Sequence, residues 1–280
     1  MPWSRRRLIV AGLAALASRA QAAEESPPQV RILFLGNSYM ATNGLPAMVG
    51  ELLQSSKLLA PHIASYLLGS YKLEQHATDP NVLKLLKDGA DDGKPWDVLV
   101  VQEQSIISSL AGIDRDAQQY MSGGLSKLVA LAREVNPKVL VVDFQVWARH
   151  ESLWAKNSPE ALSTGASPDV AHARIRQANA NAVKAALEKN AGANILVSPV
   201  GDFWRLVHDM YPALPLYAED GTHPDMLGTL LSALVLAGSI GGRDVIELSN
   251  WVPPDCPVIQ FERVKKMLLD HPEVFKNAGK

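Results

Sequence analysis

Two apolar runs that do not alternate with polar residues constrain the fold of this 280-residue chain most strongly. They are Asp97–Gln102 (DVLVVQ) and Lys138–Phe144 (KVLVVDF). A strand with one solvated face alternates apolar and polar residues, so continuous runs indicate a parallel sheet that is covered on both faces. Val30–Leu35, His62–Leu68 and Asn194–Ser198 complete the candidate strands. The pattern predicts a three-layer α/β/α sandwich around a parallel sheet of about five strands.

Segments of helical periodicity separate these strands. One apolar stripe recurs every three or four residues and stops before Pro137, which favours an amphipathic helix. Its members are Met121, Leu125, Leu128, Ala132 and Val135. We expect further helices over Pro168–Asn190 and Asp225–Ile240, the second almost wholly apolar and therefore buried. Ser152–Ser167 contains Asn, Pro and Gly and is predicted to be a long loop at the rim of a pocket.

The first 22 residues have the pattern of an export signal. A basic segment, Arg5–Arg7, precedes the apolar run Leu8–Ala17, and Ala20–Ala22 is a small-x-small cleavage signal. The apolar run is shorter than the roughly 20 residues that span a bilayer, so we expect no stable membrane insertion after cleavage. The adjacent arginines suit the twin-arginine route, and the general secretory route stays open. The mature chain, residues 23–280, is predicted to be one domain that is periplasmic or secreted.

Charge and cysteine content exclude other classes of function. The chain carries a net charge of −2, and removal of the signal, with four arginines and no acid, changes it to −6. An acidic surface repels phosphate backbones, so nucleic acid is not an expected partner. The single cysteine, Cys256, cannot form an intramolecular disulfide.

A serine follows directly on the first predicted strand, in Gly36-Asn37-Ser38-Tyr39. Open α/β sheets bind ligands at the carboxyl ends of their strands, although such a turn can also be purely structural. A serine hydroxyl becomes a nucleophile only when a base takes its proton. Asp220 and His223 lie three residues apart, a spacing that can bring the carboxylate to Nδ1 and leave Nε2 for a hydroxyl. Without Ser38, a helix-entry turn with a surface histidine would be the simpler reading.

These two segments resemble the serine and histidine blocks of the SGNH/GDSL hydrolases, which are flavodoxin-like α/β/α esterases. The resemblance covers Val30 to about Ile240 and implies two further blocks. Gly69, after the second strand, matches the glycine block, and Gln104, in Gln102-Glu103-Gln104-Ser105, stands where the family has asparagine. Gln102 replaces the family glycine. A branch of the superfamily whose first block is of the GNSY type is similar at this point.

The resemblance implies a serine esterase that hydrolyses carboxylic esters through an acyl-enzyme. Ser38, His223 and Asp220 would form the triad, while Ser38, Gly69 and Gln104 would form the oxyanion hole. A small-molecule or carbohydrate ester, with acetyl esters of carbohydrates as one option, would be the substrate. An O-acetyltransferase of the same fold and a non-catalytic carbohydrate-binding protein are the alternatives.

Other candidate residues carry less information. Trp147 and Trp154 could line an acyl or sugar pocket, or they could pack in the core or at the rim. Gln104 could instead form a structural hydrogen bond at the end of the third strand. The histidines other than His223 show no paired spacing, so neither a metal site nor a cofactor is expected.

Overall fold

The structure is a computed structural model and describes residues 26–279. The export signal predicted for residues 1–22 lies outside these residues. A sheet of five parallel strands, in the order β2-β1-β3-β4-β5, forms the middle of the molecule. The strands are β1 (Gln29–Gly36), β2 (Ala60–Leu67), β3 (Val98–Val101), β4 (Leu140–Phe144) and β5 (Asn194–Ser198). The predicted α/β/α fold with a parallel five-stranded sheet is confirmed.

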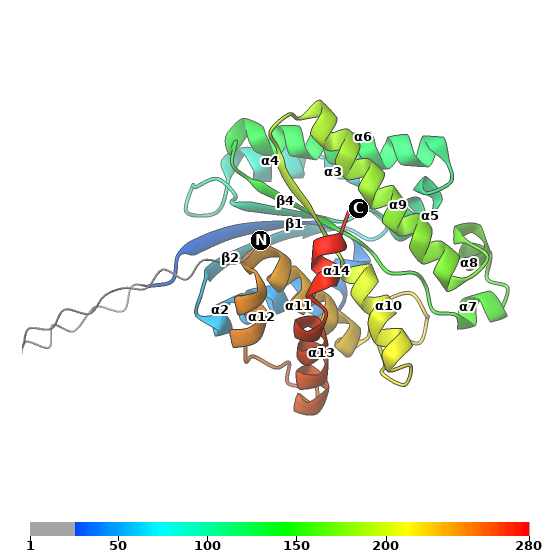
Figure 1. Ribbon diagram of the computed structural model, residues 1–280. Coiled ribbons are helices and arrows are strands. Elements are labelled where there is room, and N and C mark those ends of the chain that lie inside the picture. Colours follow the sequence, from blue (N-terminus) through cyan, green and yellow to red (C-terminus); the bar gives the residue numbers. More distant parts are fainter. Residues whose placement is uncertain (1–25, 280) are drawn as a thin grey trace, which may run out of the picture.

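Two separate hydrophobic clusters explain why the central strands are apolar at most of their positions. In β1, Ile32 and Phe34 face one cluster while Leu33 and Leu35 face the other, and all four side chains are fully buried. The alternation of a strand is therefore between two apolar layers rather than between core and water. Figure 1 shows the sheet edge-on between its two layers of helices.

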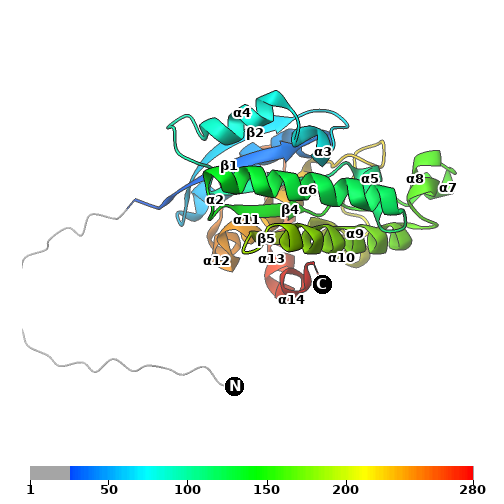
Figure 2. The ribbon, with the colours of Figure 1, turned by 90° about the horizontal axis from the view of Figure 1, so that it is seen from above.

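One layer, in the upper part of Figure 1, packs on Leu33 and Leu35. It contains α3 (Leu73–His76), α4 (Pro80–Asp88), α5 (Ser105–Ala111), α6 (Arg115–Val135) and α9 (Pro168–Lys189). The two long helices, α6 and α9, run side by side over the sheet (Figure 2). The predicted apolar stripe is the buried face of α6 from Met121 to Ala132, and its last member, Val135, is partly exposed.

The opposite layer packs on Ile32 and Phe34. It contains α2 (Leu45–Ser56), α10 (Val200–Met210), α11 (Met226–Gly241), α12 (Arg243–Leu248), α13 (Val258–Asp270) and α14 (Pro272–Asn277). The predicted apolar helix is α11, whose residues from Leu227 to Ala237 are all buried. Among residues 26–279 no helix is both long and apolar enough to cross a membrane.

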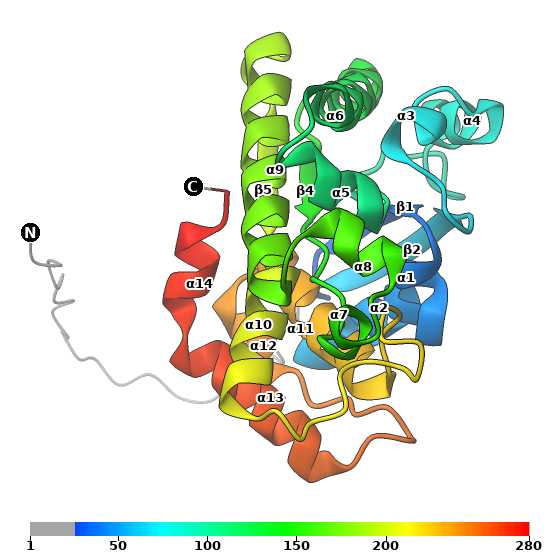
Figure 3. The ribbon, with the colours of Figure 1, turned by 90° about the vertical axis from the view of Figure 1, so that its right-hand side faces the viewer.

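The carboxyl ends of the strands face the viewer in Figure 3, with short helices around them. These are α1 (Ser38–Ala41), the 3-10 turn η1 (Thr42–Gly44), α7 (Ser152–Ala155) and α8 (Pro159–Thr164). The prediction of a long loop over Ser152–Ser167 is therefore wrong in part. Pro159 occupies the first turn of α8, where its missing N–H costs nothing.

A buried carboxyl group, Asp143, lies at the carboxyl end of β4. Its Oδ2 accepts a hydrogen bond from Asn179 Nδ2 at 2.8 Å. Its Oδ1 and the Asn179 Oδ1 are buried, and neither finds a donor in the described part of the chain. Burial raises the pKa of Asp143 to about 7, against the opposing effect of the Asn179 bond. A proton on Asp143 would supply the donor that this pair lacks.

We therefore expect Asp143 to make the protein less stable as the pH rises. Because its folded pKa of about 7 exceeds the ordinary 3.8, its contribution is fully present below pH 3.8 and is lost as the pH rises towards 7. Between pH 5 and pH 8 the free energy of unfolding should fall by at least about 1 kcal/mol relative to Asp143→Asn. Urea denaturation of both proteins at the two pH values measures the difference. Parallel pH profiles would show that Asp143 is ionised throughout.

Candidate active site

The turn after β1 presents Ser38 as the first residue of α1. Asn37 caps this short helix, and its Oδ1 accepts a hydrogen bond from Tyr39 N at 3.3 Å. Gly36 is required by close packing, since an added Cβ would lie 2.8 Å from Met40 Sδ and 3.0 Å from Gln102 Oε1. The sequence Gly-Asn-Ser therefore combines a residue without a side chain, a helix cap and a partly exposed hydroxyl in three consecutive positions.

Hydrogen bonds from Asn37 join this turn to the loops that follow the two neighbouring strands. Its backbone N–H donates to Gln102 Oε1 at 3.2 Å, after β3. Its side-chain Nδ2 donates to the Tyr71 carbonyl at 3.0 Å, after β2. Gln102, which stands where SGNH/GDSL hydrolases have glycine, thus links the end of β3 to the turn that carries Ser38.

The turn that carries His223 is organised by Asp220. The Asp220 Oδ1 accepts hydrogen bonds from the backbone N–H groups of Thr222 at 2.8 Å and His223 at 2.9 Å. At the base of the turn, Tyr217 pairs with Pro224 in an antiparallel bridge. Gly221 adopts a left-handed φ of 69°, which favours glycine. Asp220 Oδ1 therefore stabilises the turn, and Asp220 Oδ2 is free to bind the imidazole.

Ser38, His223 and Asp220 form a continuous hydrogen-bonded relay. His223 Nε2 lies 2.9 Å from Ser38 Oγ, and His223 Nδ1 lies 2.5 Å from Asp220 Oδ2. Burial would raise the pKa of Asp220, but hydrogen bonds from the His223 side chain and from the Thr222 and His223 backbone outweigh burial and lower it. The carboxylate is thus ionised at neutral pH and can stabilise a protonated imidazole. The His223 and Asp220 side chains are 35% and 48% exposed, so the relay opens to solvent.

Three hydrogen-bond donors near the carboxyl ends of the strands have no acceptor in the part of the chain that the structure describes. They are the backbone N–H groups of Ser38 and Gly69 and the side-chain Nε2 of Gln104. They follow β1, β2 and β3, which are neighbours in the sheet. An added Cβ on Gly69 would meet nothing within 4 Å, so its backbone is open to an approaching molecule. These are the three donors predicted for the oxyanion hole.

Known structures share this arrangement of strands and helices. A DUF4886 family protein from Bacteroides uniformis superposes with a TM-score of 0.65 at 19% identity, over 88% of this chain and 95% of that one. A candidate SGNH hydrolase from Slackia heliotrinireducens superposes with a TM-score of 0.54 at 25% identity, over 76% of this chain and 100% of that one. The protein has the SGNH hydrolase fold. No protein-family model and no curated protein sequence matches the chain.

Within this SGNH-fold protein, Gln104 has a second task that the sequence shows only in outline. It is the N-cap of α5, and its Oε1 accepts hydrogen bonds from Ile106 N at 2.8 Å and Ile107 N at 3.1 Å. The predicted structural role and the predicted oxyanion role therefore use different atoms of one amide group. The oxygen caps the helix, and the nitrogen stays available.

Glu103 holds the backbone of Gln104 in place through a hydrogen bond. Its Oε1 accepts hydrogen bonds from Gln104 N at 2.7 Å and from Leu73 N at 3.3 Å, and the side chain is almost wholly buried. Burial raises the pKa of Glu103 to about 7 despite these hydrogen bonds. The loop after β3 and the start of α3 are thereby fixed to one carboxyl group.

Trp147 is packed in a hydrophobic core cluster of the SGNH-fold structure. It is 1% exposed, and its ring is stacked between those of Tyr39 and Trp204. The distances between ring centroids are 4.7 Å to Tyr39 and 3.9 Å to Trp204. Its Nε1 donates to the Thr222 carbonyl at 3.0 Å. Of the two readings that the sequence left open, the structure supports packing. Through this hydrogen bond Trp147 holds the turn that carries His223. The rings of Tyr39 and His223 form a T-shaped pair with 5.3 Å between their centroids.

Trp154 is placed differently, in α7. It is partly exposed, and its Nε1 donates to the Gly165 carbonyl at 2.8 Å, which closes the segment between α7 and the end of α8. Its predicted contact with substrate stays a prediction.

Replacement of Trp147 by phenylalanine tests this supporting role. The variant keeps an aromatic ring but leaves the partly buried Thr222 carbonyl without its donor, so we expect a loss of roughly 1–3 kcal/mol in unfolding free energy. A displaced His223 turn should also lower kcat by about tenfold with little change in KM. Trp154→Phe is the matched control, because it also removes an indole N–H, but one that donates to Gly165 and not to the turn that carries His223. Equal effects of both changes on kcat would contradict the role given to Trp147.

Proposed function

We propose that the protein is a serine esterase that hydrolyses carboxylic esters through an acyl-enzyme. The observation that carries this proposal is the relay itself, with 2.9 Å between Ser38 Oγ and His223 Nε2 and 2.5 Å between His223 Nδ1 and Asp220 Oδ2. These distances are within the range over which a histidine can take a proton from a serine. The SGNH hydrolase fold supports the assignment to hydrolases.

Acylation begins when Ser38 Oγ attacks the ester carbonyl carbon and His223 Nε2 takes the hydroxyl proton. The carbonyl oxygen becomes an oxyanion, which the free donors of Ser38, Gly69 and Gln104 are placed to bind; each such donor typically lowers the barrier by about 3 kcal/mol. The C–O bond to the alcohol then breaks, and the alcohol leaves with the proton from His223. Asp220 holds the imidazole and stabilises its charged form.

Deacylation repeats these steps with water. His223 takes a proton from the water molecule as its oxygen attacks the acyl carbon, and it returns the proton to Ser38 Oγ as the bond to the enzyme breaks. The carboxylic acid and the free serine are the products. The chain's own residues carry each of these proton transfers.

For the substrate, we propose a short acyl ester, such as an acetyl ester, on a carbohydrate or a comparable polar molecule. The exposed relay supports this class, because His223 and Asp220 are open to solvent and an ester on a large molecule can reach them. We propose further that the enzyme acts after export, because the N-terminal residues have the pattern of an export signal.

A panel of esters tests the proposal. p-Nitrophenyl esters of increasing chain length and acetylated xylo- and chito-oligosaccharides are incubated with the protein, and released acid is measured with and without a deacetylated oligosaccharide as acceptor. A hydrolase releases acid in both conditions, with the fastest turnover on acetyl esters. Acyl transfer to the acceptor at the expense of acid would indicate the O-acetyltransferase. Saturable sugar binding without turnover of any ester would indicate the binding protein and overturn the proposal.

A further inference from the structure

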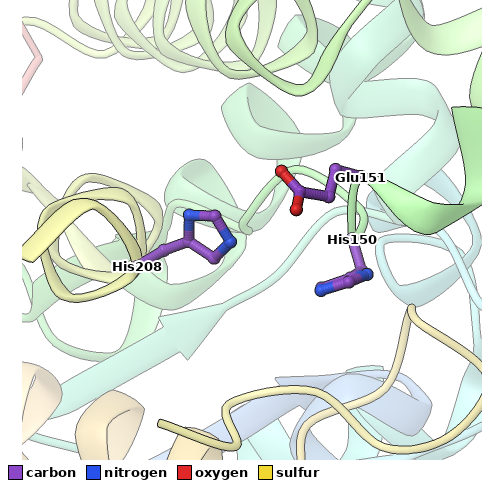
Figure 4. A group of neighbouring side chains, drawn as sticks. All are labelled: His150, Glu151 and His208. Atoms are coloured by element: carbon purple, nitrogen blue, oxygen red, sulfur yellow. The ribbon is translucent and has the colours of Figure 1, made fainter. Parts of the chain in front are cut away.

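Two histidines and a glutamate, distant in sequence, meet beside the site described above. His150 and Glu151 lie between β4 and α7, while His208 lies on α10. One nitrogen of each imidazole and one carboxylate oxygen all lie within 4.8 Å of one another. Figure 4 shows the Glu151 carboxylate and the His208 ring pointing towards the same space, with the His150 ring beside them.

These side chains border a small cavity. Its volume is about 20 Å³, and Trp147, Trp204 and Tyr217 form part of its wall. A volume of this size holds one water molecule or one ion. His172 also borders the cavity, and its buried Nδ1 has no hydrogen-bond partner among residues 26–279. The cavity therefore has room and polar partners for a single ion.

The three candidate ligands are not engaged elsewhere by strong partners. The described residues offer no ion pair to the Glu151 carboxylate, and His208 has only a distant contact of 3.9 Å from its Nδ1 to Asp209. His150 Nδ1 accepts a hydrogen bond from the Ser152 backbone N–H at 3.2 Å and lies 2.9 Å from Ser152 Oγ. Binding of a metal ion at Nε2 would therefore move the imidazole proton to Nδ1, where Ser152 Oγ can accept it in place of the bond from the backbone N–H.

Positive charge near the cavity is partly compensated. Arg149 and Arg205 also border it. Arg205 is paired with Asp169 at 2.8 Å and with Asp209 at 2.9 Å, so its charge is neutralised locally. A site with one carboxylate beside Arg149 is best suited to a metal that binds imidazole strongly, because the neutral imidazoles then supply most of the affinity.

We propose that His150, Glu151 and His208 form a site for a zinc ion. Two imidazole nitrogens and one carboxylate oxygen are a ligand set that zinc prefers, whereas Ca²⁺ and Mg²⁺ take mostly oxygen ligands. In a tetrahedral site the ligand atoms approach one another to about 3.3 Å. Rotation of the three side chains, of which Glu151 is exposed, would bring the ligand atoms to this distance. A fourth position stays open for water.

Zinc at this site would connect two elements that support the proposed active site. The backbone N–H of His150 donates to the Gly221 carbonyl at 2.8 Å, in the turn between Asp220 and His223. A metal that links His150 and Glu151 to His208 would fix this segment to α10. The expected role is structural, and the prediction concerns binding and stability rather than turnover.

The test is zinc binding to metal-free protein that carries no histidine tag. After treatment with EDTA and gel filtration, ZnCl₂ is titrated in a calorimeter at pH 7.5 against wild type, His208→Gln and Glu151→Gln. We expect one zinc per chain with a Kd of about 1 μM or tighter, and weaker binding by at least about tenfold in each variant. Zinc should also raise the melting temperature of wild type, and Ca²⁺ and Mg²⁺ should not.

His271→Gln is the matched control. His271 Nδ1 lies 2.9 Å from Glu273 Oε1, so this variant removes a surface histidine that also neighbours a glutamate. It should bind zinc as wild type does. Circular dichroism of each metal-free variant checks that it is folded, and visible absorption of bound Co²⁺ reports the ligand set independently. Absence of zinc binding to wild type, or wild-type affinity in folded His208→Gln, would overturn the proposal without bearing on the esterase.

Discussion

Replacing Ser38 by alanine is expected to reduce ester hydrolysis by at least about a thousandfold. The variant lacks Ser38 Oγ, which lies 2.9 Å from His223 Nε2, so no acyl-enzyme can form. His223→Ala should have a similar effect, because no base then takes the serine proton. The kcat of purified variants on the best ester of the panel measures both. The double variant should be no worse than either single one, since the residues act as a unit.

The melting temperature of both triad variants should stay within a few degrees of wild type, because Ser38 is partly exposed and the His223 side chain is 35% exposed. Asp220→Asn is the graded case. The amide oxygen can still accept from the Thr222 and His223 backbone, but the negative charge beside Nδ1 is lost. We expect a smaller loss of kcat than in Ser38→Ala. Near-wild-type turnover in folded Ser38→Ala would show that another residue is the nucleophile.

Gln104→Glu is expected to keep the fold and lose activity by at least about a hundredfold in kcat. The carboxylate oxygen can still accept from Ile106 N and Ile107 N, and a negative charge suits the N-terminus of α5. The donor Nε2 is gone, and an anionic oxygen would face the developing oxyanion instead. Because the binding of uncharged ester depends little on this donor, KM should change less than kcat.

Gln104→Leu separates capping from catalysis. It removes both the cap and the donor with similar bulk, so it should lose stability, by about 1 kcal/mol, as well as activity. Measurement of kcat and melting temperature on wild type and both variants gives a two-way comparison. If Gln104→Glu retained wild-type kcat per folded molecule, Gln104 would be a helix cap only, and the oxyanion would depend on Ser38 and Gly69.

The strands were predictable from sequence because their physics is local. A strand covered on both faces is apolar at nearly every position, as Val98–Val101 shows throughout and Leu140–Phe144 shows at every position except Asp143. The long helices were predictable for the same reason, since one apolar face recurs along α6. The segment over Ser152–Ser167 was harder. Its two helices are too short to show periodicity, and a hydrogen bond from Trp154 to Gly165 helps to hold them.

The burial of Trp147 could not be predicted from a local sequence pattern. Its burial depends on a stack with Tyr39 and Trp204, which come from the turn after β1 and from α10. No spacing rule links three aromatic residues so far apart in the chain. The single polar residues Ser38 and His223 were found only because each lies in a recognisable turn at an element boundary.

The cluster of His150, Glu151 and His208 was missed for a related reason. The expectation of no metal site rested on the absence of paired histidine spacing, and that spacing applies when both ligands share one helix or loop. Here the fold brings together the loop between β4 and α7 and the last turn of α10. Gln104 was recognised from its place after the third strand, but the division of its amide between a helix cap and a free donor needed the structure.

The most direct test of the proposed relay is covalent labelling of wild-type protein with a fluorophosphonate, followed by mass spectrometry of the proteolytic peptides. The reagent reacts with a serine whose proton is taken by a neighbouring base, so it reports activation without any knowledge of the natural ester. We predict one adduct per chain, on Ser38, with none in Ser38→Ala and strongly slowed labelling in His223→Ala. Absence of an adduct on folded wild type under conditions that label a known serine esterase, or an adduct on a different serine, would contradict the assignment.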